Sequence, residues 1–421
     1  MNIPLRYRAW IIWLLGALFM FYKYALEVSP SVMAPYLIRD FNINALELGN
    51  LAATYFYAYL LLQIPAGLLI DKVGARIATT CAITLCALGT LIFARADSLM
   101  IASMGRFLTG MGAAFSAISC LKMIANWFPA KKFSFMVGLM MTMAMLGAVG
   151  GQAPLAAFID AFDWRQSLQI LGLAGLALGL FFWLIVRNKA PHHDLIPVAS
   201  PHLLISLLKI LKTPACWWLS IYSGLAFAPV MVFGGLWGVS FLEAAFGLTP
   251  LRAAQSVSLI FIGFALGAPL FGWLSNILGK KRPIMFLGTF LALLSISIVI
   301  YLPVLPPIII AALLFFFGFF ISTFLLSFSM IADISSLAMA ATAIGFMNTF
   351  NALIGAFSDP FSGKLLDLNW DGQIYDGIRI FSVEAYQIAF LAIPLYLIIA
   401  LFLLIRIKES RPKESTPGIL L

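Results

Sequence analysis

The sequence predicts an all-α membrane protein with twelve transmembrane helices in two pseudo-symmetric six-helix bundles. The first observation is composition: 62% of the 421 residues are hydrophobic and only 10% are charged, whereas soluble globular domains carry about 25% charged residues. The second is that the apolar residues form runs of about 20 or more, the length that crosses a hydrocarbon core about 30 Å thick. The third is an internal repeat that relates the two halves of the chain.

Twelve apolar runs lie between clusters of charged and turn-forming residues. We expect helices at residues 9–36, 46–70, 76–95, 99–124, 133–158, 165–187, 215–242, 252–277, 283–302, 307–331, 338–364 and 384–406. With both termini in the cytoplasm, 17 of the 26 Lys and Arg residues fall in clusters on the inner side. Because positive residues favour the cytoplasmic side, this orientation is predicted, in the inner or plasma membrane of the cell. The first run is too long for a signal peptide and is expected to be a retained helix.

A polar segment between the sixth and seventh runs divides the chain. We expect a solvated cytoplasmic linker at 190–214, between an N-terminal bundle at 1–189 and a C-terminal bundle at 215–421. All three histidines lie in this region, namely His192, His193 and His202. We interpret them as linker residues and expect no metal site, because the four cysteines also lack metal-ligand spacing. The net charge of +9 sits in short clusters between the runs, so no nucleic-acid partner is expected.

The two halves of the chain repeat one another. The stretch "GLLIDKVGAR" (67–76) ends the second run and aligns with "GWLSNILGKKR" (272–282), which ends the eighth. The fifth and eleventh runs align as well, pairing Gly138 with Gly345 and Asp160 with Asp367. Two six-helix halves in the same orientation are typical of a secondary transporter with its site between the halves near the midplane.

The residues of these motifs resemble the major facilitator superfamily. "GLLIDKVGAR" is similar to the signature loop Gly-x-x-x-Asp-Arg/Lys-x-Gly-x-Arg of that family, and "RFLTGMG" (106–112) resembles its fourth-span motif. The resemblance covers essentially the whole chain. The loop lies at the cytoplasmic end of the second span. The resemblance therefore implies a cytoplasmic gate, whose contacts form only when the cytoplasmic side of the transporter is closed. The expected gating residues are Gly67, Asp71, Lys72, Gly74 and Arg76.

Few ionisable residues lie inside the predicted spans. Each costs about 2.5–3.5 kcal/mol at mid-membrane on insertion scales, so each is a candidate for function. Only two carboxylates are well inside, Glu27 and Asp359, and we expect one of them to carry the proton if protons drive transport. Lys23 and Glu27 stand four residues apart and either form a structural ion pair or contact the solute. The family resemblance implies that spans one, four, seven and ten line the cavity, which makes Lys23 and Arg106 candidate solute-binding residues.

Two polar stripes complete the candidate site. Asn348, Asn351 and Asp359 follow one face of the eleventh span, and the repeat places Gln152 of the fifth span opposite Asp359. Tyr55, Tyr59 and Gln63 recur every four residues along the second span. Each stripe fits either a cavity lining or helix–helix packing.

The predicted function is transport of a small polar solute, not enzyme catalysis. We expect a proton symporter of a zwitterion or anion, with amino acids and short peptides favoured, acting as a monomer in the lipid bilayer without a cofactor other than the proton. An antiporter that exports drugs or organic ions is the alternative, although Gln152 replaces the proline that marks such exporters in this superfamily. A transporter-like receptor or scaffold is the alternative from another class.

Overall fold

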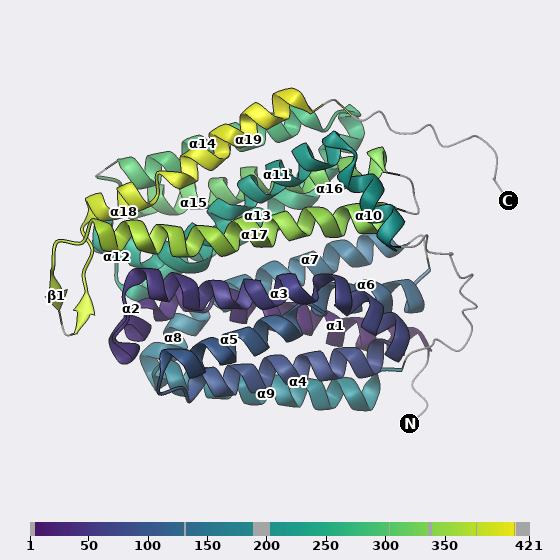
Figure 1. Cartoon of the computed structure of the whole chain (residues 1–421), viewed down its shortest axis with the longest axis horizontal. Coiled ribbons are helices and arrows are strands. Elements are labelled where there is room, and N and C mark those ends of the chain that lie inside the picture. The colour runs from purple at the N-terminus through teal and green to yellow at the C-terminus, as the bar shows by residue number, and fades with distance from the viewer. Residues whose placement is uncertain are drawn as a thin grey trace.

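The computed structural model describes residues 5–129, 132–187, 203–302, 304–335, 339–375, 377–407 and 409. The three histidines and most of the expected linker lie outside these residues. The described chain is helical except for one short β-hairpin, and its two halves lie one above the other in Figure 1.

The first half holds nine helices among the described residues. They are α1 (Leu5–Val28), α2 (Pro30–Phe41), α3 (Ala45–Val73), α4 (Ala75–Ala94), α5 (Leu99–Ala113), α6 (Ser116–Trp127), α7 (Phe133–Gly150), α8 (Ala153–Phe162) and α9 (Trp164–Ile185).

The second half contains the remaining elements. They are α10 (Leu203–Leu211), α11 (Pro214–Pro229), η2 (Val230–Trp237), α12 (Gly238–Phe246), α13 (Pro250–Leu278), α14 (Arg282–Tyr301), α15 (Pro307–Ile321), η3 (Ser322–Leu325), α16 (Leu326–Ile334), α17 (Ala340–Leu368), β1 (Ile374–Tyr375), β2 (Ile378–Arg379), α18 (Val383–Ala389) and α19 (Ala392–Arg406). The strands β1 and β2 pair antiparallel.

All twelve expected spans are helical, with ends within a few residues of those expected. Ten stretches of described residues are long and apolar enough to cross a membrane. The other two spans are α3 and α17, of 29 residues each. At 1.5 Å per residue either helix is about 43 Å long, which is enough to span a bilayer. They lie side by side where the two halves meet (Figure 1).

Several spans are interrupted near their middle. Span one breaks at Ser29, span four at Ala114–Phe115, span seven passes through the π-helix η2, and span ten passes through the 3₁₀ segment η3. These are the four spans that the family resemblance places around the cavity. Span five also breaks, at Gly151–Gln152. Residue 152 is a glutamine and not the proline that marks exporters, but span five is interrupted all the same. Pro154 lies in the first turn of α8, just after the break.

The halves meet closely at one end of the bundle and diverge at the other. We call the end with the β-hairpin the hairpin end, and the end with Lys72, Arg76 and Lys280 the basic end. At the hairpin end Gly49 of α3 lies against the Asp359–Pro360 backbone of α17, so that an added Cβ would be 2.6 Å from the Asp359 carbonyl oxygen.

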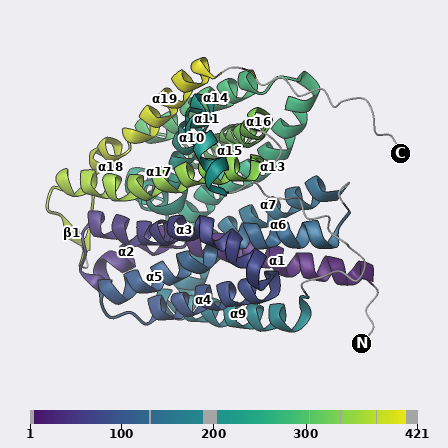
Figure 2. The same cartoon turned by 45° about the vertical axis from the view of Figure 1, so that its right-hand side comes forward.

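At the basic end the same two helices stand apart. An added Cβ at Gly67 of α3 or at Gly345 of α17 would find no described atom within 4 Å. The ribbons of the halves likewise splay toward the end that bears the chain termini in Figure 2. The hairpin end of the boundary between the halves is therefore closed in this structure, and the basic end is the more open one.

Candidate functional site

The break in span one exposes a backbone acceptor in the middle of the bundle. Leu26 lies four residues before Pro30, and proline has no amide hydrogen to donate to the Leu26 carbonyl. Two side chains take its place: Ser29 Oγ donates to Leu26 O at 2.9 Å, and Arg106 Nη1 donates to it at 2.8 Å. The proline that interrupts the span thus creates the anchor for a buried arginine from α5.

Lys23 and Glu27 form a buried ion pair on the last turns of α1. Their residues are 5% and 6% exposed, so nearly all of both side chains is removed from solvent. Tyr55 of α3 donates its hydroxyl to Glu27 Oε2 at 3.0 Å. Of the two interpretations left open by the sequence, mutual pairing is therefore realised in this structure. Because a buried ion pair has a large desolvation cost, such additional hydrogen bonds are needed to hold it.

Aromatic rings complete the surroundings of Lys23. Its Nζ lies 3.7 Å from the centroid of the Tyr24 ring and 5.2 Å from that of Tyr59, within the range of cation–π attraction. The rings of Tyr55 and Tyr59 stack with centroids 6.4 Å apart. The tyrosine stripe of α3 therefore packs against the charged face of α1. Gln63, one turn further on, has a buried Oε1 with no partner among the described residues.

Arg106 is a buried cation with unused donors. Only 2% of the residue is exposed, and its Cζ lies 5.1 Å from the centroid of the Tyr55 ring. Its Nε and Nη2 atoms have no hydrogen-bond partner among the described residues. These two nitrogens point their hydrogens along one edge of the guanidinium, the fork that binds a carboxylate with two parallel hydrogen bonds.

The second half contributes the unused acceptors. Asp359 of α17 is 2% exposed, and its Oδ1 has no partner among the described residues. Asn351, two turns earlier on α17, also has a buried Oδ1 without a described partner. Asn348 of the same helix is half-buried.

Gln152 connects the halves directly. Its Nε2 donates to the carbonyl of Gly234 at 2.6 Å, and Gly234 lies in the π-helix η2, a distortion often found at functional sites. The Gln152 Oε1 atom is buried without a described partner. That Gln152 lies opposite Asp359, as the repeat predicts, stays a prediction, and the backbone partner of Gln152 could not be read from the sequence.

The expected gating residues lie at the basic end. Gly74 has φ of 86°, a left-handed conformation that favours glycine, between α3 and α4. Arg76 stacks on Trp183 with its Cζ 4.0 Å from the ring centroid and donates to the Trp183 carbonyl at 3.0 Å, both within its own half. Lys72 is exposed. The Asp71 side chain lies outside the described structure, so the gating role of this loop stays a prediction.

Three contributors were missed from the sequence. Tyr24 follows Lys23 directly and gives it the nearest ring, a contact that adjacency alone does not predict. The Leu26 carbonyl could have been found from Pro30 four residues later. Gly234 carries no side-chain signal at all.

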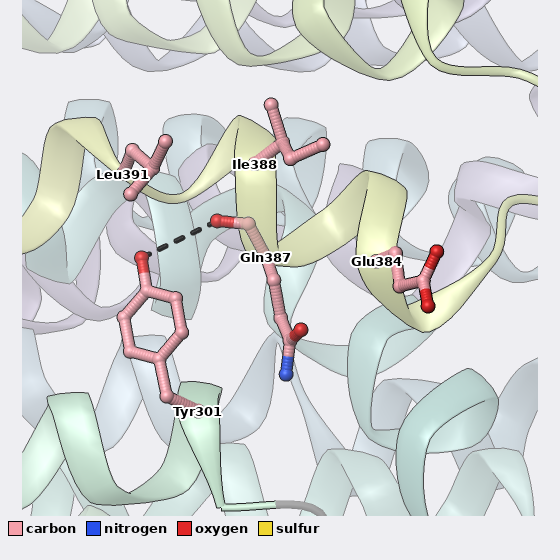
Figure 3. A pocket seen from close by; sticks show the side chains of 5 residues that line it. All are labelled: Tyr301, Glu384, Gln387, Ile388 and Leu391. Atoms are coloured by element: carbon pink, nitrogen blue, oxygen red, sulfur yellow. Dashed lines mark hydrogen bonds between the residues drawn. The ribbon is translucent and has the colours of Figure 1, made fainter.

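A surface pocket elsewhere does not compete with this site. Five residues of α14, α18 and the turn before α19 line a surface depression of about 320 Å³: Tyr301, Glu384, Gln387, Ile388 and Leu391 (Figure 3). Two of its polar groups bond locally: the Tyr301 hydroxyl donates to the Gln387 carbonyl at 3.3 Å, and Gln387 Nε2 donates to the Ile300 carbonyl at 3.0 Å. Glu384 is exposed. The buried charges described above are not among its lining residues.

Comparisons with known proteins agree with this architecture. The chain is 24% identical to the lysosomal dipeptide transporter MFSD1 of Danio rerio over 406 residues, covering 91% of this chain and 84% of that protein. It is 31% identical to the uncharacterized transporter YybO of Bacillus subtilis over 167 residues, 39% of this chain and 38% of that protein. The membrane sensor protein UhpC of Salmonella typhimurium is 22% identical over 398 residues, 88% of this chain and 89% of that protein.

Solved structures share the fold. A bacterial homolog of the human lysosomal transporter Spinster, in an inward-facing and unoccupied conformation, superposes with a TM-score of 0.76 at 15% identity, covering 97% of this chain and 96% of that one. A mutant form of the nucleoside transporter NupG gives a TM-score of 0.75 at 14% identity, covering 94% and 99%. Residues 12–358 match the family described as Major Facilitator Superfamily. The chain therefore belongs to the Major Facilitator Superfamily, a family of membrane transporters and not of enzymes.

Proposed function

We propose that the protein is a proton-coupled symporter of a small zwitterionic or anionic organic solute, with amino acids and short peptides favoured. This proposal rests on the buried polar atoms at the boundary between the halves that have no hydrogen-bond partner among the described residues. Among the described residues, the first half offers a guanidinium edge on Arg106 without a hydrogen-bond partner, and the second offers a carboxylate oxygen on Asp359 without one. A carboxylate fits the first and an ammonium group fits the second.

A zwitterion satisfies both groups at once. An unpaired buried charge is strongly destabilising, and a solute without charged groups would leave the guanidinium edge of Arg106 and the Asp359 Oδ1 atom without a charged partner among the described residues. A solute with one carboxylate and one ammonium group removes both deficits, and it contacts both halves in doing so. Contact with both halves is what a transporter requires when the halves rock around a central site.

Proton coupling is assigned to Glu27 or Asp359. Glu27 is held by Lys23 and Tyr55, so protonation of Glu27 would break the ion pair and release Lys23. In the proposed cycle a carboxylate is protonated from outside, the solute binds, the halves rock, and the proton and the solute are released inside. For a zwitterionic solute this carboxylate is Glu27, because Asp359 must stay charged to bind the ammonium group; for an anionic solute it is Glu27 or Asp359. The basic end is then the cytoplasmic end, as the positive charges predict.

Relatives with named substrates support this class of solute. MFSD1 is described as a dipeptide transporter, and the probable sulfoacetate transporter SauU of Cupriavidus necator, 22% identical over 369 residues, is named for an organic anion. The relative named as a membrane sensor favours the receptor alternative. Accumulation of solute against its gradient distinguishes a transporter from a sensor.

We further propose that the protein acts as a monomer in the cell membrane with both termini in the cytoplasm.

The proposal is tested with purified protein in liposomes. An inward proton gradient should drive accumulation of radiolabelled Ala-Ala, and a protonophore should abolish it. Glu27→Gln and Asp359→Asn should reduce gradient-driven accumulation, whereas Glu384→Gln, which alters an exposed carboxylate, should match the wild type. Accumulation that ignores the gradient, with wild-type activity in both buried variants, would sink the coupling proposal. If Ala-Ala fails, a thermal-shift screen of amino acids, organic acids and sugars identifies the solute class, since a ligand stabilises the state that it binds.

A further inference from the structure

A carboxylate of the second half caps a helix of the first half. At the hairpin end the amide of Ala45 donates to Asp367 Oδ1 at 3.0 Å, and the amide of Leu46 donates to Asp367 Oδ2 at 2.8 Å. These are the first two helical residues of α3, and Asp367 lies on the last turn of α17. The negative charge therefore also lies at the positive end of the α3 dipole.

The first half cannot satisfy these two amides through its own capping residues. The first amides of a helix have no partner within the helix. Asn44 and Glu47 form a capping box in which Glu47 N donates to Asn44 Oδ1 at 2.8 Å and Asn44 N donates to Glu47 Oε2 at 2.9 Å. The side chains of Asn44 and Glu47 thus accept hydrogen bonds only from the amides of the N-cap and of the third helical residue. The amides at the first two positions receive their acceptor from the opposite half.

The surroundings hold Asp367 in position for this contact. Arg379 of β2 brings Nη1 to 3.5 Å from Asp367 Oδ1, and its Cζ lies 4.4 Å from the centroid of the Trp370 ring. The side chain of Asp367 is 19% exposed. Gly363, one turn before Asp367, lies against the carbonyl of Ala45, where any side chain would collide. A glycine at this position permits the close approach of α17 that brings Asp367 to the end of α3.

We propose that Asp367 is the latch of the hairpin-end gate, a residue that stabilises the state closed at this end and is released when the halves rock to the opposite state. The amides belong to one half and the carboxylate to the other, so opening the hairpin end must separate them. Hydrogen bonds tolerate little elongation beyond about 3.2 Å, so both are lost together. The inference rests on this contact and on family membership, and it is independent of the identity of the solute and of proton coupling.

The proposal is tested by measuring the distance between the two halves at the hairpin end, which is longer in the open state than in the closed one. We would place spin labels at Asp97, in the exposed turn after α4, and at Val304, which is 84% exposed after α14. The exposed Cys81 is replaced by serine. Double electron–electron resonance on the labelled full chain in lipid nanodiscs then reports the fraction of molecules with a separated hairpin end.

Asp367→Asn keeps the shape but removes the charge and one of the two acceptors. We expect the ratio of separated to closed molecules to rise about 10-fold to 150-fold from the loss of one charge-assisted hydrogen bond, and the loss of the dipole interaction adds to this rise. Asp371→Asn changes an exposed carboxylate in the loop that follows α17 and should leave the distance distribution unchanged. Identical distributions in the wild type and Asp367→Asn would overturn the proposal, as would an equal shift in Asp371→Asn.

A second variant guards against misfolding as the cause. Gly363→Ala should shift the distribution in the same direction by keeping α17 from α3, without altering any charge. A label pair at the basic end, at Arg187 and Lys280, should shift oppositely, toward shorter distances, in both variants. Broadening at both ends, without a shorter basic-end distance, would indicate a loosened fold and would contradict the latch.

Discussion

Replacing Arg106 by lysine separates charge from geometry at the candidate site. Lysine keeps the positive charge but has no planar fork, so it cannot offer two parallel donors to a carboxylate while also bonding the Leu26 carbonyl as Arg106 does. One hydrogen bond to a charged group contributes about 1.5–3 kcal/mol. Losing one of the two bonds proposed for the solute carboxylate should therefore weaken binding about 10-fold to 150-fold.

The assay compares two ligands that differ only at the carboxylate. Binding of Ala-Ala and of Ala-Ala amide is measured by calorimetry on the wild type and on Arg106→Lys. The wild type should prefer Ala-Ala strongly, and the variant should lose most of that preference because the amide ligand never used the fork. Arg252→Lys, at an exposed arginine, is the matched control and should bind as the wild type does. If Arg106→Lys weakens both ligands by the same factor, Arg106 does not bind the carboxylate.

Three further predictions concern the supporting contacts. Tyr55→Phe removes the 3.0 Å hydrogen bond to the buried Glu27 carboxylate and should lower the free energy of unfolding by about 1–3 kcal/mol, seen as a lower melting temperature in detergent; an unchanged melting temperature would contradict it. Gly49→Ala should also lower the melting temperature, whereas Gly67→Ala, with no described atom within 4 Å, should not, and equal effects would refute the asymmetry of packing. Pro30→Ala restores an amide that competes for the Leu26 carbonyl, and it should weaken Ala-Ala binding about 2-fold to 12-fold; wild-type affinity would show that this carbonyl does not position Arg106.

The sequence predicts contacts within a helix far better than contacts between helices. The four-residue spacing of Lys23 and Glu27 places them on one face, and the structure pairs them. That Tyr55 donates to Glu27 depends on how α3 crosses α1, which no spacing encodes. The free edge of Arg106 depends in addition on the carbonyl exposed by the break at Ser29. The twelve spans were predictable because lipid requires long apolar helices, but polar contacts inside the bundle follow from crossing geometry.

The repeat predicted which positions of the two halves correspond, but not which of them form contacts across the boundary between the halves. Gly138 and Gly345 align by sequence, and no described atom would lie within 4 Å of an added Cβ at either. Asp160 aligns with Asp367, yet among the described contacts only Asp367 caps a helix of the opposite half. A repeat records a common ancestry of local structure, whereas the contacts across the boundary depend on which end is closed.

The candidate solute site and the latch lie along one ridge of α17. Asn351, Gly355, Asp359, Gly363 and Asp367 follow one another at intervals of four residues, and such i+4 rows are the ridges by which helices pack. Asp359 and Asp367 are eight residues apart, about 12 Å along the axis. The backbone of Asp359 touches Gly49 of α3, and Gly363 touches Ala45. Although α17 is helical over this whole distance, Pro360 follows Asp359 directly, and a proline inside a helix removes a backbone hydrogen bond and favours a kink. The proposed ammonium site at Asp359 and the proposed latch at Asp367 therefore share one face of α17 but lie on opposite sides of this proline.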